Sequence, residues 1–122
     1  MAAMPSHIRT AFESELHRAR TTSDLDEMWR ALERAHILSQ RWPWPHTRAH
    51  WHMFSLALRT RDRREALGQA VRLSGAGLAS SLGRVPIGNT GRATVGIMTP
   101  MPIPDDLARI LGEPAPGGVT RG

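Results

Sequence analysis

A short proline-containing link constrains the fold of this chain more than any other sequence feature. Residues 41–45 read Arg-Trp-Pro-Trp-Pro and separate two segments in which apolar side chains recur every three or four residues. This spacing predicts amphipathic helices, and a link of this length forces consecutive helices into an antiparallel hairpin. The sequence therefore predicts a helical hairpin with its tip at residues 41–45.

The same periodicity covers most of the chain and predicts further helices. Four main helices and a short last helix are expected at about residues 6–20, 23–40, 45–60, 62–82 and 104–111. Ser23 is expected to cap the second helix and Pro45 to lie in the first turn of the third. The apolar stripe of the second helix is expected to begin at Leu25. That of the fourth helix is expected to comprise Ala66, Leu67, Ala70, Val71 and Leu73.

The C-terminal third has a different composition. Glycine and proline recur through residues 84–104 and exclude a regular helix, yet valine, isoleucine and methionine make this stretch too apolar for a free tail. We expect it to form an ordered, extended arm across the helices, and residues 113–122 to form a flexible tail. The prediction is an all-α protein with a single domain over residues 1–112. Its architecture is a small antiparallel bundle of two helical hairpins with a Gly/Pro-rich C-terminal arm and a short last helix.

Composition limits the classes of function. The chain of 122 residues has a formal net charge of +5, and all of its basic residues are arginine. These arginines are scattered, and the densest group, at residues 59–64, is interrupted by an acidic residue, so nucleic-acid binding is not expected. The absence of cysteine excludes thiolate chemistry and cysteine-ligated metals. No membrane span or signal peptide is recognised, so a cytoplasmic protein is expected.

Three histidines lie on helix faces that are expected to be buried. His36 lies one turn before the end of the second helix, and His46 and His50 open the third helix four residues apart. At about 1.5 Å per residue, His36 and His50 each lie roughly 6 Å from the tip of the hairpin. The three imidazoles are therefore expected at nearly one depth, facing one another, which is how metal sites are built between facing helices.

Other side chains are candidates for additional ligands of the same site. Glu33 precedes His36 by one helical turn, and His7 lies near the level of the hairpin tip. Glu15 falls within the apolar stripe of the first helix, where an ion pair with an arginine is the favoured interpretation. The alternative for the histidines themselves is a structural role, with their rings hydrogen-bonded to one another, to Glu33 or to loop carbonyls.

Two resemblances bear on this interpretation. Trp29, Leu32 and His36, followed by His50, Phe54 and Ala57, are similar in spacing to a tetratricopeptide repeat, which implies the packing of one helical hairpin. The runs at residues 32–40, 45–46, 50–51, 83–92 and 101–104 resemble an uncharacterised bacterial family, domain-of-unknown-function family 3703. This resemblance implies no particular activity or catalytic residue. The resemblance also implies that related genes occur beside genes for metal efflux and metal-responsive regulation. This gene neighbourhood implies a role in metal homeostasis or resistance.

These observations favour a small metal-binding protein that holds a divalent transition metal through His36, His46 and His50. Nitrogen and oxygen ligands suit zinc, iron, nickel or copper, and the sequence does not choose among them. One alternative is a metal-dependent enzyme that uses the same site, with Glu33 or Glu15 as base. The other is a tetratricopeptide-like helical adaptor without metal that docks a protein partner through the tip at Trp42 and Trp44.

Overall fold

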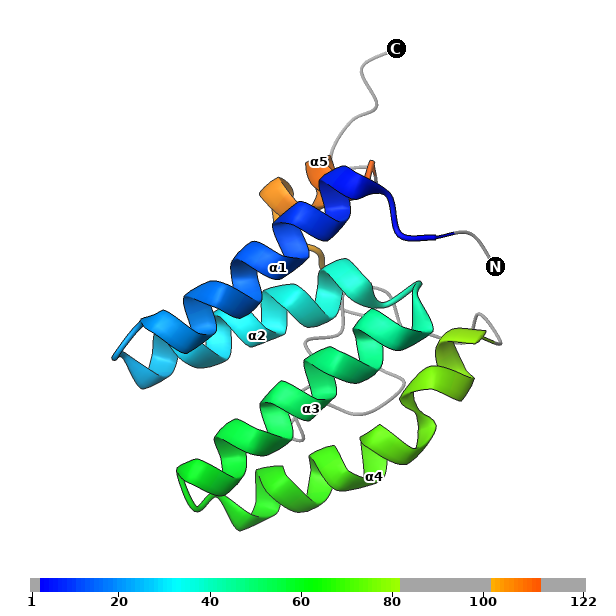
Figure 1. Cartoon of the computed structure of the whole chain (residues 1–122). Coiled ribbons are helices and arrows are strands. Elements are labelled where there is room, and N and C mark those ends of the chain that lie inside the picture. The colour runs from blue at the N-terminus through cyan, green and yellow to red at the C-terminus, as the bar shows by residue number, and fades with distance from the viewer. Residues whose placement is uncertain (1–2, 82–101, 113–122) are drawn as a thin grey trace.

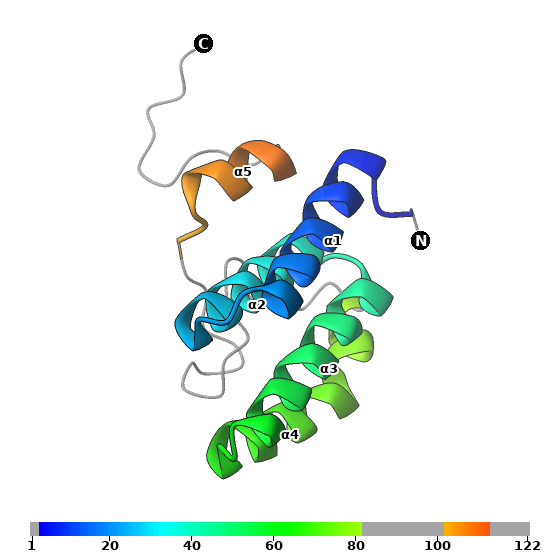
Figure 2. The same ribbon diagram turned by 60° about the vertical axis from the view of Figure 1, so that its left-hand side comes forward.

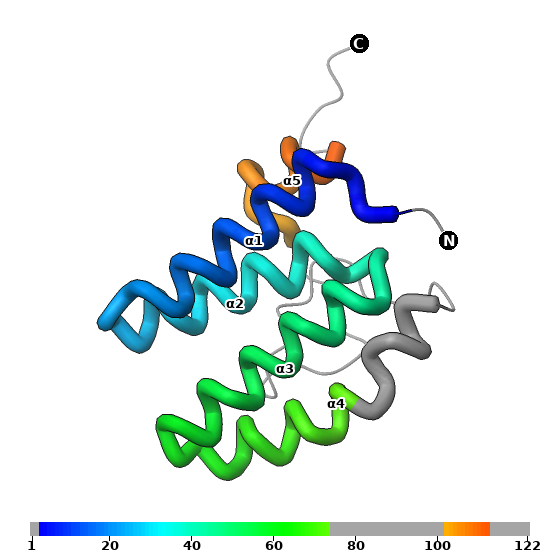
Figure 3. Tube along the Cα trace, viewed as in Figure 1, coloured from blue at the N-terminus to red at the C-terminus, as the bar shows by residue number. Residues whose placement is uncertain are grey.

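The computed structural model describes residues 3–81 and 102–112 (Figure 1). It describes side chains for residues 3–73 and 102–112, which are the coloured residues of the tube in Figure 3. The regular structure in these ranges is entirely helical, as predicted. The helices are α1 (Ser6–Thr21), α2 (Leu25–Ser39), α3 (Pro43–Arg59), α4 (Arg63–Ser81) and α5 (Asp105–Leu111). The expected arm lies outside the described residues except for residues 102–104, and the expected tail at 113–122 lies outside them entirely.

The four long helices form two antiparallel hairpins that lie next to each other (Figure 1). Helix α1 packs against α2, α2 against α3 and α3 against α4, so each of the first three helices contacts the helix that follows it in the sequence. The short helix α5 lies against α1 and α2, on the far side of the molecule from α4 (Figure 2). No helix in the described part of the chain is long and apolar enough to cross a membrane.

The core follows the predicted periodicity in the first three helices. Buried apolar side chains from α1, α2 and α3 include Ile8, Phe12, Leu16, Leu32, Ala35, Ala49, Met53 and Ala57. Leu107 and Ala108 of α5 are buried in the same cluster, which ties the end of the described chain to the first hairpin. Leu25 departs from the prediction, because it lies at the first residue of α2 and is 45% exposed.

Helices α2 and α3 begin two residues from their predicted starts, α2 later and α3 earlier. The side chain of Asp24, rather than Ser23, caps α2 by accepting hydrogen bonds from the backbone N–H groups of Asp26 and Glu27. A carboxylate at this position satisfies two free donors and interacts favourably with the helix dipole. Helix α3 begins at Pro43, whose fixed φ suits the first helical position, so Trp42 rather than Trp44 precedes the helix.

The predicted orientation of α4 is also wrong. Leu67 and Val71 are 69% and 57% exposed, whereas Glu65 and Gln69 are buried. The helix therefore turns a partly polar face toward α3 and leaves part of its apolar stripe on the surface. Burying a polar group costs free energy unless it is hydrogen-bonded, so this orientation requires polar partners on α3. On α3 the partner of Gln69 is His50, one of the three predicted histidines, and Gln69 in turn contacts Glu65.

Candidate metal centre

The hairpin of α2 and α3 brings the three predicted histidines together. His36 lies in the last turn of α2, and His46 and His50 lie on successive turns of α3. All three are buried, with exposed fractions of 3%, 5% and 3%. Because Pro43 starts α3 directly after the turn, His46 is only one turn from the tip and its ring reaches that of His36 at the end of α2.

The three side chains meet through their Nε2 atoms. The Nε2 atom of His36 lies 2.9 Å from that of His46 and 3.0 Å from that of His50. The ring centroids are separated by 4.7 Å (His36–His46), 4.6 Å (His36–His50) and 4.9 Å (His46–His50). The rings are tilted steeply against one another instead of stacking, so their nitrogen edges face a common point.

This geometry fits a bound cation better than hydrogen bonding among the rings. A ring nitrogen carries either one hydrogen or one lone pair, so Nε2 of His36 cannot form strong hydrogen bonds with both of its neighbours at once. A cation among the three atoms instead accepts a lone pair from each of them. One potential ligand atom from each of the three histidines lies within 4.8 Å of the other two, which makes this group able to hold a metal ion.

The nitrogen separations are close to those of metal ligands. Two imidazole nitrogens bound at about 2.0–2.1 Å to a tetrahedral zinc ion are about 3.3 Å apart, and neighbouring ligands of an octahedral ion at similar lengths are about 3.0 Å apart. The contacts of 2.9 and 3.0 Å thus require an outward shift of at most a few tenths of an ångström to admit an ion. A preformed set of ligands costs little rearrangement on binding.

The second nitrogen of His50 contacts a residue that sequence reasoning did not identify. Nδ1 of His50 lies 2.6 Å from Oε1 of Gln69 on α4, and Nε2 of Gln69 donates to Oε2 of Glu65 at 3.1 Å. Gln69 is fully buried and Glu65 is 3% exposed. The register between α3 and α4 could have identified Gln69, because a three-residue turn after α3 places residue 69 opposite residues 50–53. The prediction that α4 buries Leu67 and Val71 placed Gln69 on the wrong face, so this contact was not expected.

Burial also sets the charge state of His50. Removal from water lowers its pKa from the ordinary 6.5 to about 4, and the charge of Arg72 acts in the same direction. The hydrogen bond to Gln69 and the charge of Glu65 oppose this effect but are outweighed. At neutral pH His50 is therefore an uncharged base, which is the form of histidine that binds metals.

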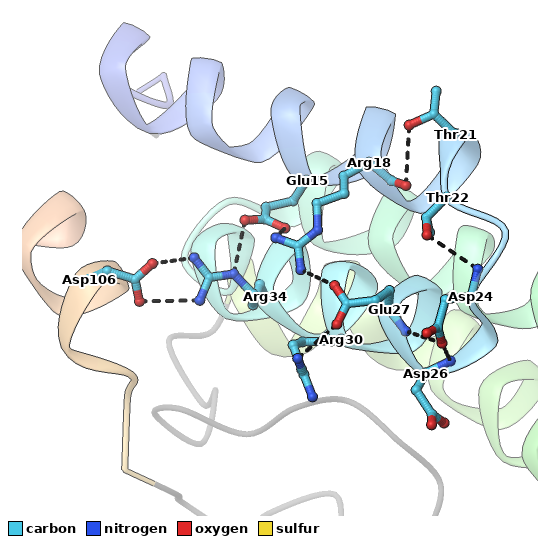
Figure 4. Close-up of polar contacts among 10 residues, drawn as sticks. All are labelled: Glu15, Arg18, Thr21, Thr22, Asp24, Asp26, Glu27, Arg30, Arg34 and Asp106. Carbon is cyan, nitrogen blue, oxygen red and sulfur yellow. Dashed lines mark hydrogen bonds and ion pairs between the residues drawn. The ribbon is translucent and has the colours of Figure 1, made fainter.

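Glu15 lies in a separate cluster of charges rather than with the histidines (Figure 4). Its Oε1 accepts a hydrogen bond of 2.9 Å from Nε of Arg34, and its Oε2 lies 3.8 Å from Nη1 of Arg18. The two terminal nitrogens of Arg34 contact both carboxylate oxygens of Asp106 on α5. The expected ion pair between Glu15 and an arginine is present.

The other two additional candidates are not grouped with the three histidines. Glu33 is half-buried on α2, one turn before His36. His7 is exposed at the start of α1, where its Nε2 lies 3.1 Å from the backbone carbonyl of Ile110. Within the described residues, the grouping of potential metal ligands therefore consists of His36, His46 and His50.

The two tryptophans of the tip have different surroundings. Trp42 is half-buried and packs against the core, whereas Trp44 is 73% exposed. Farther along α3, Trp51 and Leu58 are also on the surface. The aromatic tip therefore divides into one side chain that closes the hairpin and one that extends an exposed apolar surface.

Comparison with known proteins identifies a family but no characterised relative. No curated protein and no solved structure shows a significant match to the chain. A family model described as "Protein of unknown function (DUF3703)" matches residues 6–111, which include all five helices and the three histidines. The chain belongs to the DUF3703 family.

Proposed function

We propose that this protein binds one divalent transition-metal ion through His36, His46 and His50, with a role in metal homeostasis or resistance. The observation that carries the proposal is the meeting of three Nε2 atoms at 2.9 and 3.0 Å in a buried position. Neutral imidazole suits zinc, copper, nickel and iron. Cysteine is absent from the sequence, so nitrogen and oxygen are the ligands that the chain offers.

The burial of the cluster favours holding an ion over catalysis. A catalytic metal needs an open coordination position that a substrate can reach. The three histidines are at most 5% exposed, so access to the ion requires the surrounding helices or loops to move. A buried ion that leaves only when the surrounding structure moves suits storage or delivery. An enzyme that uses Glu33 or Glu15 as base is the less favoured function, because Glu15 is engaged by Arg34.

The proposal is tested on protein purified without a histidine tag. We expect elemental analysis or titration to give about one zinc, nickel, copper or iron ion per chain, bound with submicromolar affinity. The melting temperature should rise on loading, because a ligand of the native state stabilises that state. Protein that carries no metal, and whose melting temperature is unchanged by each of the four ions, would exclude the proposed function.

An exposed stripe on α3 favours protein binding as a second candidate function. Trp44, Trp51 and Leu58 lie seven residues apart, on one side of the helix, and are 73%, 57% and 56% exposed. The half-buried Phe54 extends the stripe, with its ring centroid 6.0 Å from that of Trp51. Helix α3 contains no acidic residue, and arginines at positions 59, 61, 63 and 64 surround Asp62 at the turn that follows it. This combination fits an acidic amphipathic helix of a partner protein.

A photo-crosslinking amino acid at position 51 tests this second candidate in cells. We expect an adduct whose crosslinked segment is acidic and amphipathic, and we expect the substitution Leu58→Asp to abolish it. The same crosslinker at position 17, an exposed site on α1, is the control. A crosslinked segment without acidic residues, or equal adducts at both positions, would contradict an acidic partner at this stripe.

A further inference from the structure

A chain of two hydrogen bonds runs from the histidine cluster into α4. The Nδ1 atom of His50 contacts Oε1 of Gln69 at 2.6 Å, and Nε2 of Gln69 contacts Oε2 of Glu65 at 3.1 Å. All three side chains are buried. A buried carboxylate and a buried amide are costly unless they are hydrogen-bonded, so a specific arrangement must compensate for their presence on the inner face of α4.

The order of donors and acceptors in this chain follows from its last member. Oε2 of Glu65 accepts the hydrogen bond that Nε2 of Gln69 donates, so the NH₂ group of the amide faces Glu65. The carbonyl oxygen of the same amide then faces His50. A carbonyl oxygen also only accepts, so Nδ1 of His50 must carry the hydrogen. In neutral imidazole the other nitrogen, Nε2, is left with the lone pair.

That lone pair lies where the proposed metal site requires it. Nε2 of His50 is the atom 3.0 Å from Nε2 of His36, at the meeting point of the three rings. The opposite tautomer would place a hydrogen in the metal position. Ligating histidines in other metal sites are held in the same way, by a hydrogen bond from the nitrogen that does not bind the metal.

We infer that Gln69 is a positioning residue that holds His50 as a metal ligand through Nε2, and that Glu65 fixes the orientation of the Gln69 amide. This inference rests on the proposed metal-binding function. Glu65 acts through orientation more than through charge, because the half-buried guanidinium of Arg72 also acts on the site and offsets part of the carboxylate's effect on His50.

The backbone at the start of α4 supports this role. Oδ1 of Asp62 accepts a hydrogen bond of 3.0 Å from the backbone N–H of Glu65, and the carbonyl of Asp62 accepts from Ala66. This cap fixes the first turn of the helix and thereby places Glu65. Gln69 follows one turn later on the same face, which is the spacing at which two helical side chains meet.

The first experiment substitutes Gln69→Met, which preserves length and burial but removes the acceptor for His50. In metal-free protein, nitrogen-15 NMR should show His50 of the wild type with hydrogen on Nδ1, and a mixture of tautomers in the variant. Zinc affinity should fall about ten- to a hundredfold, as for other residues that orient a metal ligand. An unchanged tautomer together with unchanged affinity would overturn the inference.

The hydrogen bonds from His50 to Gln69 and from Gln69 to Glu65 form a relay. A second pair of variants tests the direction of this relay and whether its function can be restored. Glu65→Gln alone allows the Gln69 amide to turn over, so it should partly lose the Nδ1–H tautomer. The double substitution Glu65→Gln with Gln69→Glu exchanges amide and carboxylate, restores an acceptor for His50 and keeps the net charge. We expect it to restore both tautomer and zinc affinity. A double variant as defective as Gln69→Met would contradict the assigned order of donors and acceptors.

Ala66→Gly is the matched control for general weakening of α4. It lies between the two relay residues, and glycine lowers the melting temperature through the backbone. Its His50 tautomer should match the wild type. The tautomer measurement needs no metal, so it decides on the relay even if the wild type binds none. In Gln69→Met, an unchanged tautomer together with normal metal binding would reject the role of Gln69 while leaving the metal site intact.

Discussion

Arg34 and His36 lie two residues apart on α2, but their side chains enter polar clusters of opposite kinds. Arg34 projects between Glu15 and Asp106, so that one cation is matched by two carboxylates from other helices. His36 projects into a group of three bases of the same type. The first cluster balances its charges within the protein. The second brings three imidazole nitrogens close together, an arrangement that could hold a metal ion.

The contrast indicates how buried polar groups divide between stability and binding. Ion pairs from distant parts of the chain, such as Arg34 with Asp106, fasten one helix to another. Convergent bases of one kind add little to stability by themselves, because neutral imidazoles gain little from one another. We therefore expect substitutions at the charged cluster to change stability and substitutions at the histidines to change metal affinity.

The largest effect is expected from removing a histidine ligand. His50→Ala should weaken metal binding at least about a hundredfold, since loss of a direct ligand should exceed the 10–100-fold effects of residues behind it. His36→Ala and His46→Ala should behave alike in isothermal titration. His17→Ala, an exposed histidine of α1, is the control and should be near silent. If the three substitutions lower stability but leave metal affinity unchanged, the histidines are structural.

The stability of the metal-free protein should depend on pH through His50. Its pKa is about 4 in the folded chain and about 6.5 when unfolded, so the unfolded chain binds more protons between these values. Stability contributed by keeping His50 neutral is present above about pH 6.5 and is lost as the pH falls toward 4. The expected loss is about 3 kcal/mol.

Urea denaturation across this pH range measures the effect. The half-buried His52, whose pKa is also lowered by burial, should add a smaller loss in the same direction. The pKa of Asp106 is lowered by Arg34, so its contribution is lost only below its ordinary value of 3.8. His50→Gln should flatten the profile between pH 6.5 and 4. A flat profile in the wild type would contradict the burial of a neutral His50.

Arg34→Met should destabilise the fold by roughly 2 kcal/mol, less than for a fully buried pair because Asp106 is about half exposed. The substitution leaves Glu15 buried without its closest cationic partner. Metal affinity should stay unchanged, which separates the two clusters. Arg30→Ala is the control, since Arg30 forms an exposed pair with Glu27 and should cost well under about 1 kcal/mol. A large loss of metal affinity in Arg34→Met would show that the clusters are coupled.

The smallest effect is expected at the attachment of α5. Asp106→Ala removes one of the two carboxylates on Arg34 and should cost about 1 kcal/mol. Amide hydrogen exchange should accelerate in α5, around Leu107 and Ala108, before it changes elsewhere. Asp105→Ala, next to it but exposed, is the matched control. Equal effects of the two substitutions would assign the loss to the helix N-terminus instead of the ion pair.

The sequence predicts the features that follow from helical periodicity. The positions of five helices and the meeting of three histidines depend only on spacing and on the short link at residues 41–45. The face of α4 could not be predicted in this way, because periodicity assumes that apolar side chains turn inward. Here the neighbour of α4 presents His50, and the polar Gln69 satisfies it better than Leu67 would. Similarly, the partner of Arg34 on α5 is 72 residues away and has no local signal.

X-ray absorption spectroscopy of the protein loaded with one equivalent of zinc tests the central claim most directly. We predict a first shell with three imidazole nitrogens at about 2.0–2.1 Å. One nitrogen should be lost in His36→Ala, and the wild-type shell should be kept in His17→Ala. A first shell made mainly of oxygen, or a spectrum unchanged by substitution of His36, His46 or His50, would contradict a metal site at this cluster.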